Sequence, residues 1–305
     1  MATPILMPNK MSRHGAVADH GLLATNGRSL EIGTGFKALT FREKDFPGAM
    51  DPLVMVDHYT MTEPTFGVHP HAGLSAVSVL FEDSEGRFHN RDTLGNDFDL
   101  LPGDLYWLKA GAGVVHDESP RPGARIHGLQ VFVNLPSVIR SGEPESMHVK
   151  AQSVPVLEGE GTRVRILLGS SNGITTQQSL AVPMTILDGR VDKDAGFTHT
   201  LEEAQSAWIV AIEGQLELTI SGRGVTLSAG QAIAVSAAAL AEMNDHLVLS
   251  IGFTNKGEAS AHFVLFAAKP IGETFVQKGP FVMDSLADIE RVESDYLAGK
   301  FGRLA

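Results

Sequence analysis

The sequence predicts an all-β protein built from two barrels, and three observations support this prediction. The chain has 305 residues, about twice the size of a typical domain. Short runs that favour β-structure alternate with turns marked by its 32 Gly and 15 Pro. Gly86 and Gly103 are 17 positions apart, and Gly214 and Gly230 are 16 positions apart. We interpret this near-equal spacing of turn glycines as a repeat of one barrel plan.

In the first half of the chain, the predicted strands are separated by turns with a clear chemical basis. Ser75–Phe81 alternates small or polar with apolar side chains, and Glu82–Gly86 supplies the turn after it. The Pro-Gly-Asp sequence at 102–104 predicts a second turn, because proline fixes φ and glycine tolerates positive φ. The further predicted strands are Asp97–Leu101, Leu105–Lys109, Gly113–Glu118 and Ile126–Leu135.

The second half of the chain repeats this plan. Ala207–Ile212 and the cleanly alternating Gln215–Ile220 are predicted strands on either side of a turn at Glu213 and Gly214. A polar stretch at 136–162 contains three prolines and four glutamates, and we interpret it as the connection between the halves. The predicted domains are therefore residues 1–140 and 141–305.

The end of the chain predicts an amphipathic helix. Ser285 and Asp288 have the spacing of a capping box, with Asp in place of Glu. Gly299 marks a plausible end of the helix. We expect the helix to pack against a barrel through an apolar stripe formed by Leu286, Ile289, Val292 and Tyr296.

Composition and charge exclude several classes of protein. The 36 acidic residues outnumber the 24 Lys and Arg and leave a formal charge of −12, which disfavours nucleic-acid binding through bulk charge. The chain has no cysteine, so it has no disulfide framework, thiolate nucleophile or Cys-ligated zinc. The sequence shows neither a signal peptide at its start nor a window of membrane-helix length. We expect a soluble monomer in the cytoplasm, or in the nucleus if the source is a eukaryote.

Two pairs of side chains have the spacing of a metal site. His69 and His71 stand at i and i+2, so in an extended strand they point to the same face, and His116 and Glu118 repeat this spacing. On neighbouring strands of a barrel they would bring together three nitrogens and one oxygen. That set suits Fe(II), Ni(II), Mn(II), Cu(II) or Zn(II) better than Ca²⁺ or Mg²⁺. The alternative is an ordinary surface or turn role, and spacing alone does not decide between the two.

Four segments of the sequence resemble the pirin family of the cupin superfamily. Val68–Pro120 carries the most specific motifs, which are HPHAG, RDTLGN and LPGDLYWLKAGAGVVHDESP. Asp51–Tyr59 resembles an early strand of the family, and Val131–Pro136 resembles the close of its first barrel. Gly272–Phe301 resembles its C-terminal strand and helix. Together these segments extend the resemblance over nearly the whole chain.

The resemblance implies two cupin barrels that face each other, followed by a C-terminal helix, with one metal in the first barrel only. The family's four metal ligands fall on His69, His71, His116 and Glu118, and the metal expected there is Fe(II), with Ni, Mn, Cu or Zn as alternatives. The second half has no His-x-His pair. We therefore expect its barrel to be structural, with its histidines scattered at His199, His246 and His262.

The sequence departs from the family pattern at two positions near these ligands. Ala72 stands where the family usually has Arg or Lys, which predicts that a positive charge near the mouth of the site is missing. Asn90 stands where the family usually has His. We also expect Asp117 to face away from Glu118, and His127 to lie close behind the metal site.

The resemblance implies two alternative functions. Some members are similar to quercetinases, which open the central ring of a flavonol with O₂, and in that reading Glu118 is catalytic and takes the proton of the flavonol hydroxyl. Other members bind protein partners, either transcription factors or a metabolic enzyme, with the iron as a redox switch. We favour the dioxygenase, with a small aromatic substrate such as a flavonol, because it uses the open metal positions.

Overall fold

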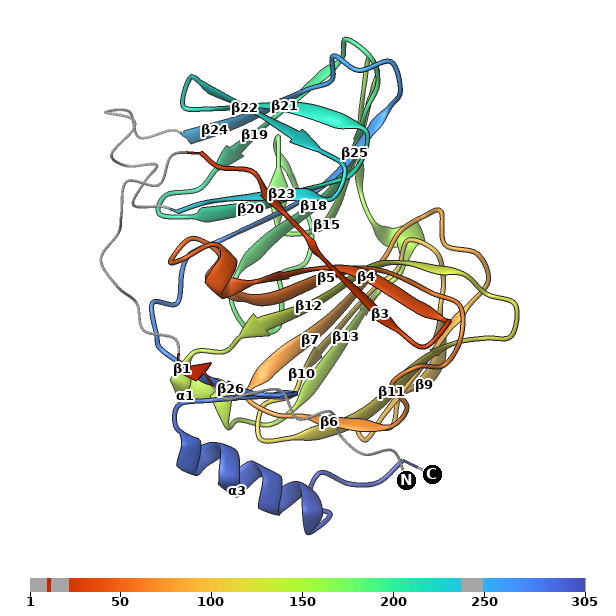
Figure 1. Cartoon of the computed structure of the whole chain (residues 1–305), viewed down its shortest axis with the longest axis vertical. Helices are drawn as coiled ribbons and strands as arrows, with labels where there is room; N and C mark the ends of the chain where they lie inside the picture. The colour runs from red at the N-terminus through yellow and green to blue at the C-terminus, as the bar shows by residue number, and fades with distance from the viewer. Residues whose placement is uncertain (1–9, 12–21, 237–248, 305) are drawn as a thin grey trace.

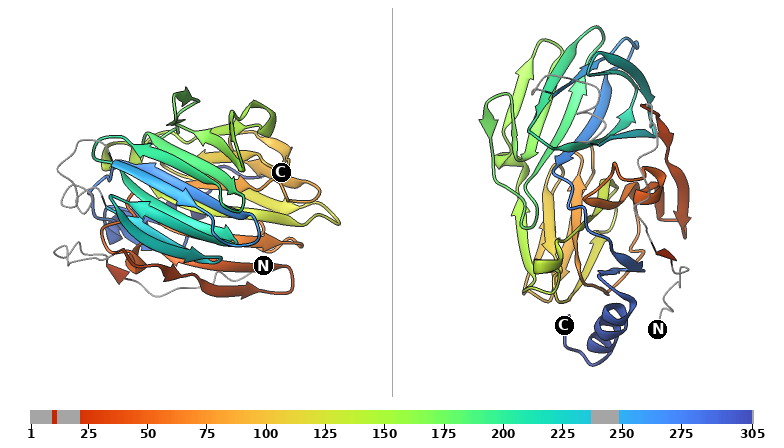
Figure 2. Two further views of the ribbon diagram at one scale, coloured as in Figure 1. Left: turned by 90° about the horizontal axis from the view of Figure 1, so that it is seen from above. Right: turned by 90° about the vertical axis from the view of Figure 1, so that its left-hand side faces the viewer.

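The computed structural model describes residues 10–11, 22–236 and 249–304, and it shows two β-barrels stacked along the long axis of the molecule (Figure 1). The first barrel, in orange and yellow, lies below the second barrel, in green and blue. Helix α3 (Leu286–Leu297) lies beneath the first barrel, on the side away from the second barrel, as Figure 2 also shows. The predicted all-β architecture of two cupin barrels with a C-terminal helix is confirmed.

The first barrel consists of a larger and a smaller antiparallel sheet. The larger sheet has the strand order β13-β10-β7-β12-β5-β4-β3, and the smaller sheet has the order β6-β11-β8-β9. The strands of the larger sheet are β3 (Arg28–Ile32), β4 (Phe36–Arg42), β5 (Leu53–Met61), β7 (Leu74–Leu80), β10 (Leu105–Lys109), β12 (Ile126–Asn134) and β13 (Glu145–Val149). Those of the smaller sheet are β6 (His69–His71), β8 (Phe88–Asp92), β9 (Asp97–Leu100) and β11 (Val114–Pro120).

The second barrel repeats this arrangement. Its larger sheet has the order β14-β15-β18-β25-β20-β23-β2, and its smaller sheet has the order β19-β24-β21-β22. The strands of the larger sheet are β2 (Thr25–Asn26), β14 (Val156–Gly159), β15 (Thr162–Leu168), β18 (Met184–Val191), β20 (Ser206–Glu213), β23 (Gln231–Val235) and β25 (Ala261–Ala268). Those of the smaller sheet are β19 (Gly196–Leu201), β21 (Gln215–Ile220), β22 (Arg223–Ser228) and β24 (Leu249–Thr254).

Short elements connect the strands. They are η1 (Glu43–Asp45), α1 (Ser137–Arg140), η2 (Ala151–Ser153), β16 (Ser170–Ser171) and β17 (Ile174–Thr175). Most strands that the sequence predicts agree with the structure to within one or two residues, and β10 and β21 agree in both bounds.

The turn glycines confirm the internal repeat. Gly86 lies between β7 and β8, and Gly214 lies between the corresponding strands β20 and β21. Gly103 and Gly230 likewise precede the corresponding strands β10 and β23. The φ angles of the four residues lie between +71° and +86°, a region that favours glycine. The predicted repeat is therefore one of backbone conformation as well as of spacing.

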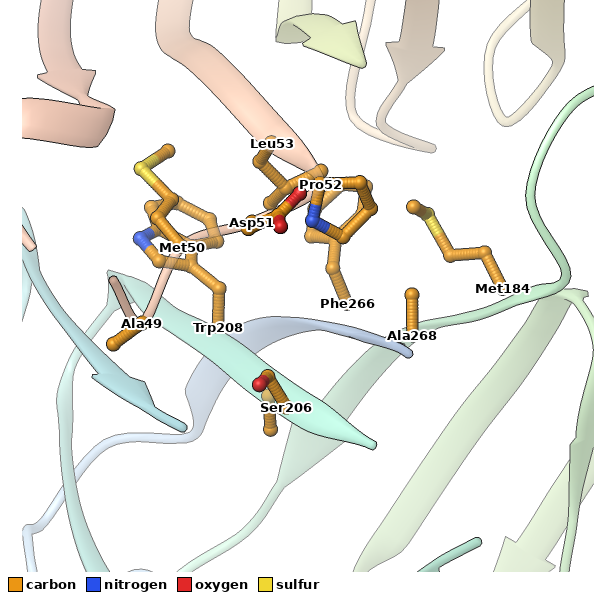
Figure 3. A pocket seen from close by; sticks show the side chains of 11 residues that line it. Ala49, Met50, Asp51, Pro52, Leu53, Met184, Ser206, Trp208, Phe266 and Ala268 are labelled. Atoms are coloured by element: carbon orange, nitrogen blue, oxygen red, sulfur yellow. The ribbon is translucent and has the colours of Figure 1, made fainter. Parts of the chain in front are cut away.

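The larger sheets of the two barrels pack face to face and share one apolar core. Trp208 of the second barrel contacts Phe41 and Phe46 of the first, with ring centroids 5.4 and 6.4 Å apart. A small cavity between the barrels is lined by Met50, Trp208 and their neighbours (Figure 3). Its volume of about 10 Å³ holds at most one water, so we interpret it as a packing gap.

Each end of the chain crosses to the other barrel. Near the N-terminus, β2 forms the edge strand next to β23 of the second barrel. At the C-terminal end, β26 (Val276–Lys278) and β27 (Phe281–Met283) form a hairpin, which pairs with β1 (Lys10–Met11) and packs with α3 on the first barrel. The predicted helix is confirmed: Ser285 accepts a hydrogen bond from the Asp288 amide, and Ile289 and Val292 are buried. The predicted apolar stripe is wrong for Leu286, which is 44% exposed in the first turn of the helix, whereas Tyr296 packs against the buried cluster.

Candidate metal centre

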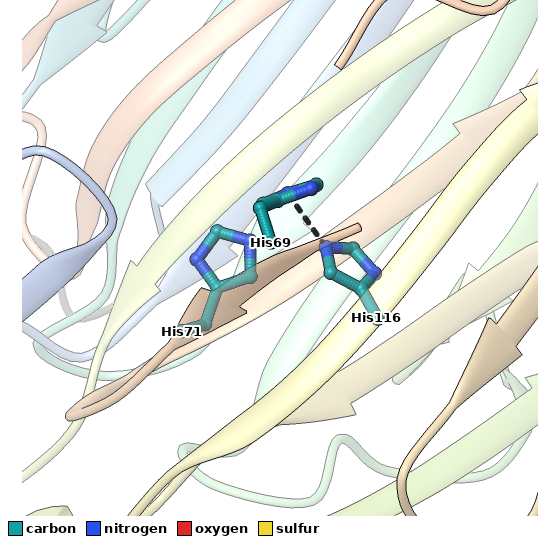
Figure 4. A group of neighbouring side chains, drawn as sticks. All are labelled: His69, His71 and His116. Atoms are coloured by element: carbon teal, nitrogen blue, oxygen red, sulfur yellow. Dashed lines mark hydrogen bonds between the residues drawn. The ribbon is translucent and has the colours of Figure 1, made fainter. Parts of the chain in front are cut away.

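Two neighbouring strands of the smaller sheet bring three histidines together inside the first barrel. Strand β6 carries His69 and His71, and the antiparallel β11 places His116 directly opposite His69. Alternation along each strand turns all three side chains to the same face. The ring centroids are 4.4 Å apart for His69 and His116, 4.8 Å for His71 and His116, and 5.0 Å for His69 and His71 (Figure 4).

The ring nitrogens of these histidines converge on a common point. One ligand atom from each residue lies within 4.8 Å of the others, and the Nε2 atoms of His69 and His116 are 3.0 Å apart. Nδ1 of His69 is 2.7 Å from the carbonyl oxygen of Gly67, and Nδ1 of His71 is 3.2 Å from that of Pro280. A carbonyl oxygen can only accept a hydrogen bond, so both rings carry their proton on Nδ1. Their Nε2 atoms are therefore unprotonated and can ligate a metal.

Burial keeps the three imidazoles uncharged. It lowers the pKa of His71 to about 3, and the neighbouring His69 adds to this effect. It holds the pKa of His116 well below the ordinary value, again reinforced by the adjacent histidines. The pKa of His69 is lowered by burial as well, although its bond to the Gly67 carbonyl opposes the shift. Neutral imidazoles are the form that ligates metals, so no proton has to be displaced at neutral pH.

The three histidines fit a divalent transition metal. Among the residues that the structure describes, they form the only cluster of at least three histidine or acidic side chains close enough to share an ion. Nδ1 of His116 is buried without a hydrogen-bond partner, so no contact at that nitrogen fixes the tautomer of the ring. Three converging nitrogens suit Fe, Ni, Cu or Zn better than they suit Mg²⁺ or Ca²⁺.

Glu118, the fourth predicted ligand, lies in the same barrel but outside the group of three histidines. Both of its carboxylate oxygens lie 2.8 Å from the hydroxyl of Ser78 on β7, in the opposite sheet. That hydroxyl is also 3.0 Å from Oε1 of Gln130 on β12. Burial raises the pKa of Glu118 to about 7, and the hydrogen bond from Ser78 limits the rise.

The two departures from the family pattern have different surroundings. Asn90 is fully buried and pairs with Glu118 across β8 and β11, so it belongs to the interior of the site. Ala72 is not at a mouth of the site, contrary to our expectation. It is buried under the C-terminal hairpin, where it forms a bridge with Phe281. A long cationic side chain at this position would meet the hairpin rather than a substrate.

His69 is the least buried of the three histidines, whereas His71 and His116 are buried. Phe66 and Val68 stand beside His69 and are 47% and 48% exposed. The Phe66 ring lies 6.4 Å from the His69 ring and packs edge-on against Phe36. These two side chains give the surface next to His69 an apolar character.

In the described part of the second barrel, the positions that correspond to the three histidines form no histidine group. The turn glycines and the strand pairing align the two barrels, so each position of the site has a counterpart in the second barrel. His69 corresponds to His199. The other counterparts are Leu201 for His71, Ile251 for His116 and Phe253 for Glu118, and all three are buried. His199 is hydrogen-bonded to the hydroxyl of Ser171. His246, another of the scattered histidines, lies outside the described residues.

Two further residues that the sequence singles out lie away from the histidine group. Asp117 faces away from Glu118, as predicted, and forms an ion pair with Arg91 at 3.0 Å. His127 was expected close behind the metal site, but β12 turns it towards the second barrel. There it contacts Asp83 at 2.8 Å and His58 at 2.8 Å. The alternation along β12 explains the difference, because Gln130 faces the site and His127 faces the other way.

The sequence pattern missed Ser78, Gln130 and Pro280. Ser78 contacts Glu118 across 40 positions of the chain, and the pairing of β7 and β12 places Gln130 next to Ser78. Pro280 contacts His71 across 209 positions. No local motif marks such contacts.

Comparisons with known proteins match both barrels. The family model described as pirin matches residues 37–133, and the one described as the pirin C-terminal cupin domain matches residues 186–302. The chain is 30% identical to human pirin over 254 residues, which cover 83% of each protein. Among the residues that the structure describes, no helix has the length and apolar character needed to cross a membrane.

Two solved structures show the same fold. A quercetin 2,3-dioxygenase from Acinetobacter baumannii has a TM-score of 0.78 and 23% sequence identity, and the match covers 93% of this chain and 98% of that one. A bacterial pirin from Escherichia coli in complex with nickel(II) has a TM-score of 0.60 and 15% identity. That match covers 82% of this chain and 100% of the other.

Proposed function

The chain belongs to the pirin family, and from this premise we propose that it is a metal-dependent dioxygenase of the quercetin 2,3-dioxygenase type. One observation carries the proposal: three neutral, converging imidazoles and a buried carboxyl with a pKa of about 7 share the interior of one barrel. The likeness to a quercetin 2,3-dioxygenase supports it at the level of the fold. The substrates would be a flavonol and O₂.

The proposed ligands are His69, His71 and His116, with the Glu118 carboxylate as a fourth. Iron(II) is the metal we propose first, and nickel, manganese, copper and zinc fit the same donors. A metal bound there would act as a Lewis acid that lowers the pKa of the flavonol 3-hydroxyl. The other steps depend on residues of the chain itself.

Glu118 is the base in this proposal. With a pKa of about 7, a substantial fraction of the carboxyl is ionised at neutral pH and can accept the proton of the flavonol 3-hydroxyl at Oε1 or Oε2. Ser78 holds the carboxyl on the inner face of the larger sheet, and Gln130 lies next to the Ser78 hydroxyl. The deprotonated flavonol then reacts with O₂, its central ring opens, and the products are a ring-opened ester and carbon monoxide.

The side of the site next to His69 is the proposed entrance for the substrate. A flavonol is flat and aromatic, and Phe66 and Val68 offer it an exposed apolar surface beside His69. Phe132 lies against His71, a second proposed ligand, with ring centroids 5.1 Å apart. Aromatic side chains next to both histidines favour a planar aromatic substrate over a charged one.

The test is a direct assay of flavonol oxidation. The protein is stripped of metal, reloaded separately with Fe(II), Ni(II), Mn(II) or Cu(II), and mixed with quercetin in air while the visible absorbance is followed. We expect the flavonol absorbance to fall with at least one metal and carbon monoxide to be released. The His69→Ala variant serves as the control and should be inactive.

Metal bound without turnover in any of the four preparations would reject the dioxygenase. The alternative would then be a regulator that binds a protein partner and senses the oxidation state of the iron. Its test is a pull-down with the Fe(II) and Fe(III) forms, and identical partners in both forms would count against it.

A further inference from the structure

The C-terminal hairpin, which we define as residues 276–283, lies directly against the strand that carries His71. The chain leaves the second barrel after β25 and returns to the first barrel to form this hairpin. Ala72, the residue after His71, forms a parallel bridge with Phe281. The Val282 amide donates to the Ala72 carbonyl at 3.0 Å. The hairpin is therefore hydrogen-bonded to the backbone immediately next to a proposed ligand.

The turn of the hairpin contacts the His71 ring itself. The Pro280 carbonyl oxygen lies 3.2 Å from Nδ1 of His71 and accepts a hydrogen bond from it. His71 is only 2% exposed, so water has little access to replace this carbonyl. The bond fixes the ring orientation, and it fixes the tautomer that leaves Nε2 free.

Close packing on both sides holds the hairpin in this position. A Cβ at Gly73 would lie 1.8 Å from the Val282 carbonyl oxygen and 2.5 Å from Sδ of Met283, so only glycine fits there. At the other end of the hairpin, the buried Arg140 forms an ion pair with Asp284. Helix α3 covers the hairpin from outside, and Lys278 pairs with Glu293 at 2.8 Å.

We propose that the C-terminal hairpin is a positioning element of the metal centre, in which the Pro280 carbonyl fixes the tautomer and orientation of His71. This inference rests on the proposed metal site, whose ligands come from the first barrel, and it assigns the C-terminal end of the chain a role in that site. Groups that orient a ligating histidine are typically worth about 10- to 100-fold in metal affinity.

The test displaces the hairpin without touching a proposed ligand. Gly73→Ala places a methyl group against the Val282 carbonyl at a φ of +73°. Gly48→Ala is the matched control, because Gly48 has a φ of +69° and nothing within 4 Å of the added Cβ. Affinity for Ni²⁺ is measured by competition with a chelator. We expect Gly73→Ala to weaken binding by about 10- to 100-fold and the control to match the wild type.

A second measurement reads the tautomer in the metal-free protein. Long-range ¹⁵N–¹H spectra of histidine-labelled wild-type protein should show His71 protonated on Nδ1 and protected from solvent exchange. Gly73→Ala should lose that protection. Should Gly73→Ala not fold, Asp284→Asn, at the exposed end of the Arg140 ion pair, takes its place with the same expected direction.

The two proposals fail in different ways. Wild-type protein that binds no Ni²⁺ would overturn the proposed metal site. The positioning role would still be tested by the His71 tautomer, because that is measured in the metal-free protein. Wild-type affinity together with an unchanged His71 signal in the displaced variant would overturn the positioning role.

Discussion

Replacing Ser78 by alanine should shift the titration of Glu118 to higher pH. The Ser78 hydroxyl lies 2.8 Å from both carboxylate oxygens of Glu118 and donates a hydrogen bond to the ionised carboxylate. This hydrogen bond is the interaction that most strongly opposes the rise of the Glu118 pKa caused by burial. Serine and alanine differ by one oxygen atom, and Ser78 is only 2% exposed, so the change removes the hydrogen bond with little change in volume.

The size of the shift follows from the hydrogen bond that is lost. A hydrogen bond to a charged group contributes about 1.5–3 kcal/mol, and one pKa unit corresponds to about 1.36 kcal/mol. The bond stabilises the ionised carboxylate, so its loss raises the pKa by about 1 to 2 units. From the wild-type value of about 7, the pKa of Glu118 should reach about 8 to 9 in the variant.

Infrared difference spectroscopy of the metal-free protein measures this titration directly. The C=O band of the protonated acid is followed against pH, and a Glu118→Gln variant identifies the band. In the active enzyme, the rising limb of kcat/KM against pH should move in the same direction. Ser75→Ala is the matched control, because Ser75 is a buried serine of the same strand whose hydroxyl has no hydrogen-bond partner. A Glu118 pKa in Ser78→Ala within about 0.3 units of the wild-type value would show that the Ser78 hydroxyl does not stabilise the ionised carboxylate.

Three further predictions follow from the same structure. His69→Ala should lose stoichiometric metal by elemental analysis, whereas His199→Ala, at the corresponding position of the second barrel, should retain it; equal loss in both would contradict the single site. Trp208→Ala should lower the free energy of unfolding by about 3–5 kcal/mol in chemical denaturation, because its ring fills the interface between the barrels. A loss below about 1 kcal/mol would show that the Trp208 ring does not stabilise this interface. Phe66→Ala should raise KM for quercetin several-fold with little change in kcat or Tm, and an unchanged KM would remove Phe66 from the entrance.

The sequence predicted the histidine group because its information is local. His69 and His71 are two positions apart, and strand alternation alone places them on one face. The pairing with His116 needed only the further assumption that the two strands are neighbours, which the structure confirms. The turn glycines predicted the repeat for the same reason, since a positive φ is a local requirement.

The contacts that surround the site could not be predicted in this way. Ser78 reaches Glu118 because β7 and β11 face each other across the barrel, and this depends on how the two sheets close. His127 lies on a strand of the site, but the register of β12 turns it towards the second barrel. The contact of Pro280 with His71 depends on the return of the C-terminal segment to the first barrel. Side-chain spacing along the chain records none of these long-range pairings.

The most direct test of the central claim is a crystal structure of the metal-loaded protein with diffraction data collected at the absorption edge of the metal. We predict a single strong anomalous peak per chain, within coordination distance of Nε2 of His69, His71 and His116. A peak in the second barrel, or the absence of a peak at the three histidines in fully loaded protein, would contradict this prediction.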